Sequence, residues 1–226
     1  MTHHLVFHRQ QALDNFLSLC SIKEYPAKST LIHSGAINTM LYYIIEGSVV
    51  VEAHNENENR KLVLAYLGQG EFIGELGVFK SNMIHPMDMT IEQTVIVNVI
   101  TRCDCKLARI THERARHVLK NMIPNDAPDI LLMLGEQMAE RLLTTSRNFR
   151  DLAFMDAKGR IARSLLDLCQ EPEAIKSEQG TQLKISRQEL ARIVGCSREV
   201  VGKALKCLEE EQFIATVGRR IIVLDF

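Results

Sequence analysis

The chain has 226 residues, 46% of them hydrophobic and 24% charged, and its formal net charge is -1. This length and composition are ordinary for a globular protein of one large or two smaller domains, and with so balanced a charge any basic surface must be local. No stretch approaches the roughly 18 apolar residues that cross a bilayer, and the first ten residues lack the apolar centre of a signal peptide. We therefore expect a cytoplasmic protein with no membrane partner.

The first half of the chain has the pattern of short strands. Four segments are rich in β-branched and aromatic residues: 41–53, 60–72, 90–100 and 105–110. Gly47, Gly68 and Gly70 punctuate them, which favours an antiparallel roll or barrel over a doubly wound sheet. A short helix beginning near Thr111 closes this domain.

Six cysteines are spread along the chain, and only Cys103 and Cys105 are close together in sequence. A zinc or iron-sulfur site usually spaces its cysteine pair by two or more residues and needs further ligands nearby. We therefore expect no metal site. The sequence also shows no nucleophile with a neighbouring base, no paired carboxylates and no GxxxxGKS loop, so we expect no enzyme.

A long apolar seam follows Pro124 and Pro128. Its members step by three or four residues along one predicted helix: Leu131, Leu134, Met138, Leu142, Thr145, Phe149 and Leu152. So narrow a stripe favours pairing with the same helix of a second copy and therefore predicts a homodimer. The alternative is an internal helix that packs on the strand domain. Thr145 and Ser146 place hydroxyls in the seam, where they need each other, water or a ligand.

Two short helices joined by a tight turn are predicted near the C-terminus. An amphipathic helix at 159–169 and a polar loop at 171–182 precede them. Ser186 and Glu189 form a capping box that starts the first helix, Gly195 ends it, and Ser197 caps the second. This is the pattern of a helix-turn-helix, and a hairpin turning at Gly218 adds a wing.

The second of these helices carries an arginine in its first turn, which the helix dipole mildly disfavours. Arg198, Glu199 and Lys203 lie opposite the apolar stripe. If the N-terminus enters a DNA major groove, Arg198 can bind guanine O6 and N7, and Glu199 can accept from cytosine N4. Three residues at or near helix starts are placed to hold phosphates: Arg187, Gln188 and Ser197. The alternative is a solvated face of mixed charge.

Three stretches carry a resemblance to a known family: ISRQELARIVGCSREVVGKALKCLEE, YPAKSTLIHSGAINTMLYYIIEGSVVV and GQGEFIGELGVF. Together with AERLLTTS in the long helix, they resemble the bacterial cyclic-AMP receptor protein (catabolite activator) and fumarate-nitrate regulator family, from about Phe16 onward. The resemblance implies an α+β fold with a cyclic-nucleotide-binding-like β-roll at 1–125, a dimerisation helix at 126–153 and a winged helix-turn-helix at 154–226.

The same resemblance implies a regulator that binds palindromic promoter sites in double-stranded DNA and recruits RNA polymerase. Arg198, Glu199 and Lys203 would then contact base edges, while Arg187, Gln188 and Ser197 contact phosphates. Lys203 stands where the family usually has arginine; a lysine keeps the charge but loses the bidentate fork, so we expect looser discrimination at that base. The loop at 173–181 matches the position of the family's polymerase contact, although its sequence differs.

The resemblance also implies an effector pocket for cyclic AMP or another cyclic nucleotide. Gly74 and Glu75 match the ribose-binding part, and Thr145 with Ser146 match the base-facing part. The family's Arg-Ser pair, which holds the cyclic phosphate, is replaced here by His85 and Pro86. Loss of such a charge-assisted contact costs about 1.5 to 3 kcal/mol.

Three readings of the pocket follow. It binds a cyclic mononucleotide weakly or in an altered way, with His85 as a pH-dependent substitute cation; it takes a different effector, such as a cyclic dinucleotide; or the regulator is effector-independent and the roll is structural. A nucleotide-sensing interaction module without DNA binding is a more remote alternative, because it gives no reason for the Ser197-Arg198-Glu199 helix start.

Overall fold

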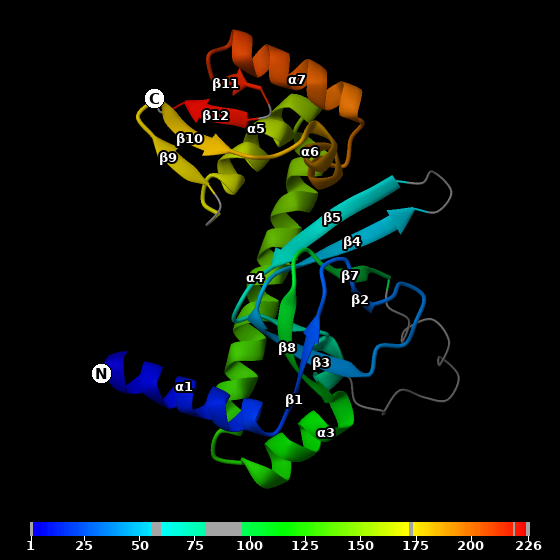
Figure 1. The fold of residues 1–226 in the computed structure, drawn as a ribbon, viewed down its shortest axis with the longest axis vertical. Coiled ribbons are helices and arrows are strands. Elements are labelled where there is room, and N and C mark those ends of the chain that lie inside the picture. Colours follow the sequence, from blue (N-terminus) through cyan, green and yellow to red (C-terminus); the bar gives the residue numbers. More distant parts are fainter. Residues whose placement is uncertain (1, 56–59, 80–95, 172–173, 219, 225–226) are drawn as a thin grey trace. The chain divides into compact units, whose positions relative to one another are not determined.

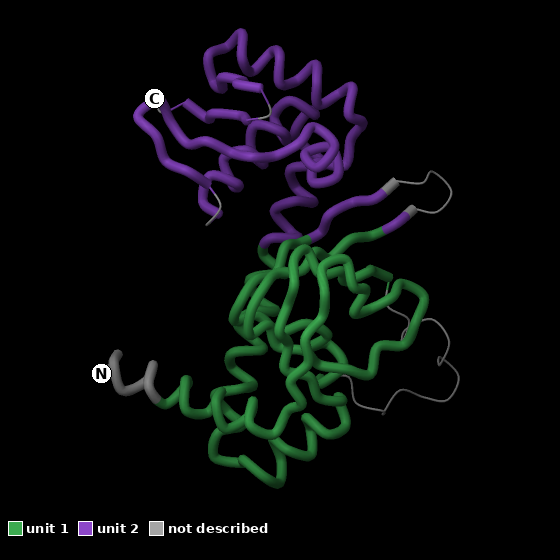
Figure 2. Tube along the Cα trace, viewed as in Figure 1, with its two compact units in different colours: residues 1–53, 65–143 green, residues 54–64, 144–226 purple. Residues whose placement is uncertain are grey.

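The computed structural model describes residues 2–55, 60–79, 96–171, 174–218 and 220–224. The chain divides into two compact units, which Figure 2 shows in different colours. Unit 1 comprises residues 1–53 and 65–143, and unit 2 comprises residues 54–64 and 144–226.

Unit 1 is built mainly from two four-stranded sheets, with strand orders β1-β8-β3-β6 and β2-β7-β4-β5 (Figure 1). The strands are β1 (Ser21–Tyr25), β2 (Thr30–Ile32), β3 (Met40–Glu46), β4 (Val49–Asn55), β5 (Arg60–Leu67), β6 (Phe72–Ile73), β7 (Asn98–Thr101) and β8 (Cys105–Thr111). The tips of β4 and β5 are counted with unit 2. β3 pairs antiparallel with β8 and β4 with β7, so the antiparallel roll expected from the sequence is confirmed.

Helices pack against the first of these sheets. They are α1 (Thr2–Ser18), α2 (Leu76–Phe79), α3 (His112–His117), a π-helical turn η1 (Val118–Met122) and the first part of α4 (Ala127–Phe154). Phe16 of α1 meets Phe72 of β6 edge to face, with ring centroids 6.4 Å apart, and Ile130 and Leu134 of α4 are buried in the same cluster.

The sequence analysis missed α1, β1 and β2. α1 has only a weak amphipathic pattern, and its position depends on contacts with distant residues. Arg9 donates to both carboxylate oxygens of Glu136 on α4, at 3.0 and 2.7 Å, and Asn15 donates to Asp126 at 2.8 Å. Such tertiary contacts leave no periodic signal in the local sequence.

Unit 2 holds the winged helix-turn-helix. It contains the end of α4, then α5 (Ala157–Leu168), β9 (Ile175–Ser177), β10 (Gly180–Leu183), α6 (Arg187–Val194), α7 (Arg198–Glu210), β11 (Ile214–Val217) and β12 (Arg220–Leu224). The strands form one sheet in the order β11-β12-β10-β9, and the three helices α5, α6 and α7 share a core that includes Leu165, Leu190 and Leu205.

The polar loop expected at 171–182 is wrong in part, because this segment contains β9 and most of β10. β9 is a short edge strand whose residues are all exposed, so it shows no alternation of apolar and polar residues. Gly180 has a φ of +133°, and a Cβ there would overlap the carbonyl of Val223. Close pairing of β10 with β12 therefore requires glycine at this position.

The predicted caps of the helix-turn-helix are confirmed. Ser186 accepts a hydrogen bond from the Glu189 amide at 3.1 Å, and Ser197 accepts one from the Val200 amide at 3.3 Å. Gly195 ends α6 with a φ of 71°. At the other end of α7, Glu209 accepts from the amide and the hydroxyl of Thr216 on β11, at 2.8 and 2.6 Å, and so ties the reading helix to the wing.

The apolar seam on α4 is buried in one part and exposed in another. Leu134 is fully buried in unit 1, as the internal-helix alternative requires. Leu142, Phe149 and Leu152 are exposed by 67%, 72% and 58% in the single chain. The second part of the seam therefore has apolar side chains that the single chain does not cover.

Alanine substitutions at Gly195 and Gly135 should change the free energy of unfolding in opposite directions. Gly195→Ala forces a side chain into a left-handed conformation and should lower the free energy of unfolding by about 1 kcal/mol. Gly135→Ala lies in α4 with no atom near its Cβ position and should raise that free energy by about 0.5 to 1 kcal/mol. Chemical denaturation monitored by circular dichroism measures both, and shifts of the same sign would contradict this account.

Candidate functional site

The first turn of α7 brings the predicted base-reading residues together. Arg198, Glu199 and Lys203 are all exposed, whereas Val201 and Leu205, on the opposite face, are buried in the unit 2 core. The buried stripe fixes the rotation of the helix, and this rotation is what leaves the three polar side chains free to contact another molecule.

The Glu199 carboxylate is held at the helix start. Its pKa is lowered by hydrogen bonds from its own backbone amide and then from the Ser197 hydroxyl, with a further contribution from the charge of Arg198. The carboxylate is therefore ionised at neutral pH and can only accept hydrogen bonds. This is the state that accepts from a base amino group such as cytosine N4.

The predicted phosphate-binding residues lie around the same helix start. Arg187 and Gln188 begin α6 and are exposed, and the Arg187 guanidinium passes close to Gly202 on α7, where a Cβ would lie 3.9 Å from its Nη1. A Cβ at this distance would be an ordinary van der Waals contact, so Arg187 lies beside α7 without requiring glycine at position 202. The Ser197 hydroxyl already serves as a cap.

The second predicted site is the turn from Gly74 to Gly77, which we call the effector turn. Gly74 has a φ of +82°, and a Cβ there would lie 2.5 Å from the Met40 carbonyl oxygen, so this position requires glycine. Glu75 follows, and its side chain is buried, with 8% of its surface exposed. A buried carboxylate needs a charged or hydrogen-bonding partner.

Arg141 of α4 is that partner. Its Nη1 donates to Glu75 at 2.6 Å, and its Nη2 donates to the Phe72 carbonyl at 2.7 Å and lies 3.5 Å from the Glu71 carboxylate. Its Nε is also buried and has no hydrogen-bond partner among the described residues. The Nε–H group of this guanidinium is therefore unsatisfied within the described residues.

Gln137 lies one turn before Arg141 and reinforces the same junction. Its amide oxygen accepts from the Phe72 amide at 3.0 Å, and its amide nitrogen donates to the Phe72 carbonyl and to Glu71, both at 3.2 Å. The side chain thus pairs with β6 as a neighbouring strand would. α4 is therefore fixed to the effector turn through side chains rather than through apolar packing alone.

The sequence analysis missed Arg141 and Gln137 as site residues. Both lie four residues apart on one face of α4, and Arg141 stands within the AERLLTTS segment, so their spacing was a usable signal. Thr145 and Ser146 follow on the same helix and are exposed in the single chain. The predicted His85 lies outside the described residues.

Arg102 is an arginine of unit 1 whose side chain stacks on an aromatic ring. It follows β7, its backbone amide donates to the Ser48 carbonyl at 2.9 Å, and its guanidinium lies over the Tyr66 ring, 4.3 Å from the centroid. This stacking engages the side chain within the second sheet of unit 1.

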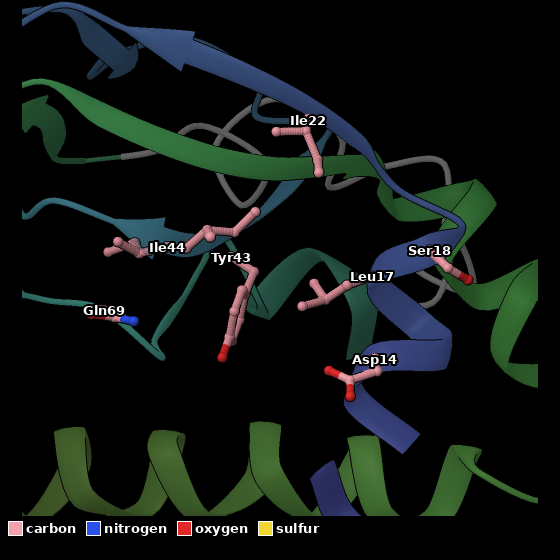
Figure 3. Close-up of a pocket in the computed structure, with 8 residues that line it drawn as sticks. Asp14, Leu17, Ser18, Ile22, Tyr43, Ile44 and Gln69 are labelled. Atoms are coloured by element: carbon pink, nitrogen blue, oxygen red, sulfur yellow. The ribbon is translucent and has the colours of Figure 1, made fainter. Parts of the chain in front are cut away.

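A surface hollow of about 360 Å³ lies elsewhere in unit 1 (Figure 3). Asp14 and Leu17 of α1 face Tyr43 of β3 across it, and burial raises the pKa of Tyr43, to which the charge of Asp14 adds. Its lining does not include Gly74, Glu75 or Arg141. The hollow is therefore separate from the effector turn.

Within the described residues, no helix is long and apolar enough to cross a membrane. In the same residues, no group of three or more histidine, cysteine, aspartate or glutamate side chains is placed to hold a metal ion.

Comparison with known proteins matches both parts of the chain to family models. A cyclic nucleotide-binding domain model matches residues 22–122, and a Crp-like helix-turn-helix domain model matches residues 159–226.

Several full-length relatives are transcription regulators. The chain is 44% identical over 211 residues to the cAMP-activated global transcriptional regulator CRP of Salmonella typhimurium, covering 93% of each chain. It is 41% identical to the CRP-like protein Clp of Xanthomonas euvesicatoria, covering 93% of this chain and 87% of that protein. The solved structure of the c-di-GMP responsive global regulator CLP of Xanthomonas campestris superimposes with a TM-score of 0.84 at 39% identity, over 96% of this chain and 100% of that one.

These matches extend over nearly the whole sequence and agree with the antiparallel roll, the long α4 and the winged helix-turn-helix. The chain belongs to the CRP family of DNA-binding transcription regulators, which are not enzymes.

Proposed function

We propose that this regulator works as a homodimer that reads a two-fold symmetric promoter site with the N-terminal turns of its two α7 helices. The observation that carries this proposal is the exposed set Arg198, Glu199 and Lys203 at the start of α7. In this proposal the chain has three parts: an effector-binding-like roll at 1–125, a dimerisation helix at 126–153 and a DNA-binding domain at 154–226. The protein is cytoplasmic, and it also contacts RNA polymerase.

The three side chains divide the recognition between them. Arg198 binds a guanine through O6 and N7, and Glu199 accepts from the amino group of a cytosine. Lys203 contacts a further base edge as a point charge and discriminates less than an arginine would. Arg187, Gln188 and Ser197 hold the phosphates on either side and so fix the register of the helix.

Substitutions at these positions test base reading directly. Arg198→Ala should cost about 1 to 3 kcal/mol of binding free energy on a cognate palindrome and should abolish the preference for guanine at one position of each half-site. Glu199→Ala should likewise relax one position. Electrophoretic shifts on a panel of single-base variants measure both.

The control for that experiment is Arg163→Ala on α5, which removes the same charge but leaves the exposed first turn of α7 unchanged. It should weaken binding to all sequences by a similar small factor or leave it unchanged. Retention of the full base preference in Arg198→Ala and Glu199→Ala would refute the assignment of these two residues.

Dimer formation is proposed to use the exposed second part of the α4 seam. Leu142, Phe149 and Leu152 bring large apolar surfaces to one stripe, and the family's promoters are palindromic, which requires two-fold symmetry in the protein. Thr145 lies within this stripe and would meet its counterpart on the second copy.

A charge in the stripe should separate the two copies. Phe149→Glu would bury an unpaired carboxylate at the interface and should shift the protein toward monomer at micromolar concentration in sedimentation velocity. Arg147→Glu, on the same turn but off the stripe, is the matched control and should stay dimeric. A wild-type monomer, or equal dissociation of both variants, would contradict a dimer built on this seam.

For the effector, we propose a cyclic nucleotide bound beside the Glu75–Arg141 ion pair. The carboxylate can accept from a ribose hydroxyl, while the partnerless Nε of Arg141 and its positive charge suit an anionic phosphate. Arg141 then supplies part of the charge that the family's Arg-Ser pair gives, with His85 as a further pH-dependent cation. Thr145 and Ser146 contact the base.

Two effectors remain in competition within this proposal. The CRP relatives are activated by cyclic AMP, whereas the structurally similar CLP of Xanthomonas campestris is responsive to cyclic di-GMP. A cyclic dinucleotide presents two phosphates and a larger body, and the lost Arg-Ser pair favours an effector other than cyclic AMP. The third possibility is a regulator that binds DNA without an effector.

Calorimetry with cyclic AMP, cyclic GMP and cyclic di-GMP distinguishes these cases. The true effector should bind to Glu75→Gln and Arg141→Gln about ten- to a hundredfold more weakly than to the wild type, because each change removes a charge-assisted contact. Lys120→Gln, an exposed position on η1, should bind normally. Tight binding that is insensitive to Glu75→Gln would refute this pocket, and no binding of any nucleotide would support effector independence.

A further inference from the structure

Two side chains of α3 contact the backbone of the effector turn. His112 and Arg116 lie four residues apart and so share one face of this short helix. The His112 Nε2 lies 2.9 Å from the carbonyl oxygen of Gly74, and the Arg116 Nη1 donates to the carbonyl oxygen of Gly77 at 2.8 Å. The pair thus holds both ends of the turn.

The fit between the turn and His112 is close. A Cβ on Gly77 would overlap the imidazole ring, so the glycine is what lets the ring lie under the turn. The Gly77 amide donates to the Gly74 carbonyl at 3.3 Å, and the Val78 amide donates to the Glu75 carbonyl at 2.9 Å. The Gly74 oxygen therefore accepts two hydrogen bonds, one from the turn itself and one from α3.

His112 is a buried ring beside backbone acceptors. Burial lowers its pKa, with the charge of Arg116 adding to this effect against hydrogen bonds to the Gly74 and Met40 backbone. The ring is therefore neutral at pH 7 and carries one proton. Because a carbonyl oxygen only accepts, the tautomer with its proton on Nε2 is the one that donates to Gly74 across the 2.9 Å contact.

We propose that His112 and Arg116 are positioning residues of the effector site, which hold the Gly74 and Gly77 carbonyls so that Glu75, between them, faces Arg141. This rests on the proposed effector function of the turn. Loss of His112 would remove one of the two hydrogen bonds that the Gly74 oxygen accepts, and loss of Arg116 would remove the side-chain hydrogen bond to the half-buried Gly77 carbonyl; either loss would let the turn open.

Hydrogen exchange of the full-length protein, measured by mass spectrometry without nucleotide or DNA, tests the proposal. His112→Phe keeps the ring volume but loses the donor, and exchange in the 72–79 segment should rise about fivefold or more. His112→Gln should restore slow exchange, because its amide N–H can reach the same carbonyl. Arg116→Met should speed exchange at the Gly77 end.

Arg114→Met, an exposed position on the same helix, is the matched control and should exchange as the wild type does. Equal exchange in the Phe and Gln variants of His112 would show that the residue only fills space, and would overturn the proposal. Unchanged exchange in both His112→Phe and Arg116→Met would overturn it as well. Because no ligand is present, these outcomes are independent of whether cyclic nucleotides or promoter DNA bind.

Discussion

The constraint on which unit 1 depends is the burial of a carboxylate. Glu75 has little access to water, and an uncompensated charge in such a position costs several kcal/mol. Arg141 compensates it, and the guanidinium in turn needs the Phe72 carbonyl and Glu71 to satisfy its other N–H groups. β6, the effector turn and α4 are thereby tied together by polar contacts whose geometry is specific, whereas apolar packing alone would tolerate sliding.

In unit 2, apolar packing and helix caps determine the position of α7. An apolar stripe packs α7 against α5 and α6, Ser197 caps its start, and the left-handed Gly195 ends the helix before it. The polar side chains at the start of α7 make few contacts inside the unit. The exposed positions at the start of α7 can therefore be substituted without loss of the fold.

The parts of the fold that sequence patterns predicted are those that local rules determine. Ser186, Gly195 and Ser197 carry capping signals that need no knowledge of the rest of the chain. α1 escaped prediction because its stability comes from partners far away in sequence, such as Glu136 for Arg9. β9 escaped because its residues are all exposed and show no alternation of apolar and polar positions. Arg141 escaped because a charged residue on a long helix is usually solvated, and its spacing from Gln137 points to a shared helix face but not to the buried partner Glu75. Helix periodicity predicted which side chains of α7 are exposed, whereas their proposed base contacts rest on chemistry and on the family.

The double hydrogen bond from Thr216 to Glu209 joins the last turn of α7 to β11. Because β11 is paired along its length with β12, the hairpin and the helix make up one mechanical body. If the hairpin lies against a DNA groove, a change in the width of that groove would therefore tilt the axis of α7 as well. The local width of the double helix, which depends on base composition outside the contacted positions, can in this way bias where the protein settles.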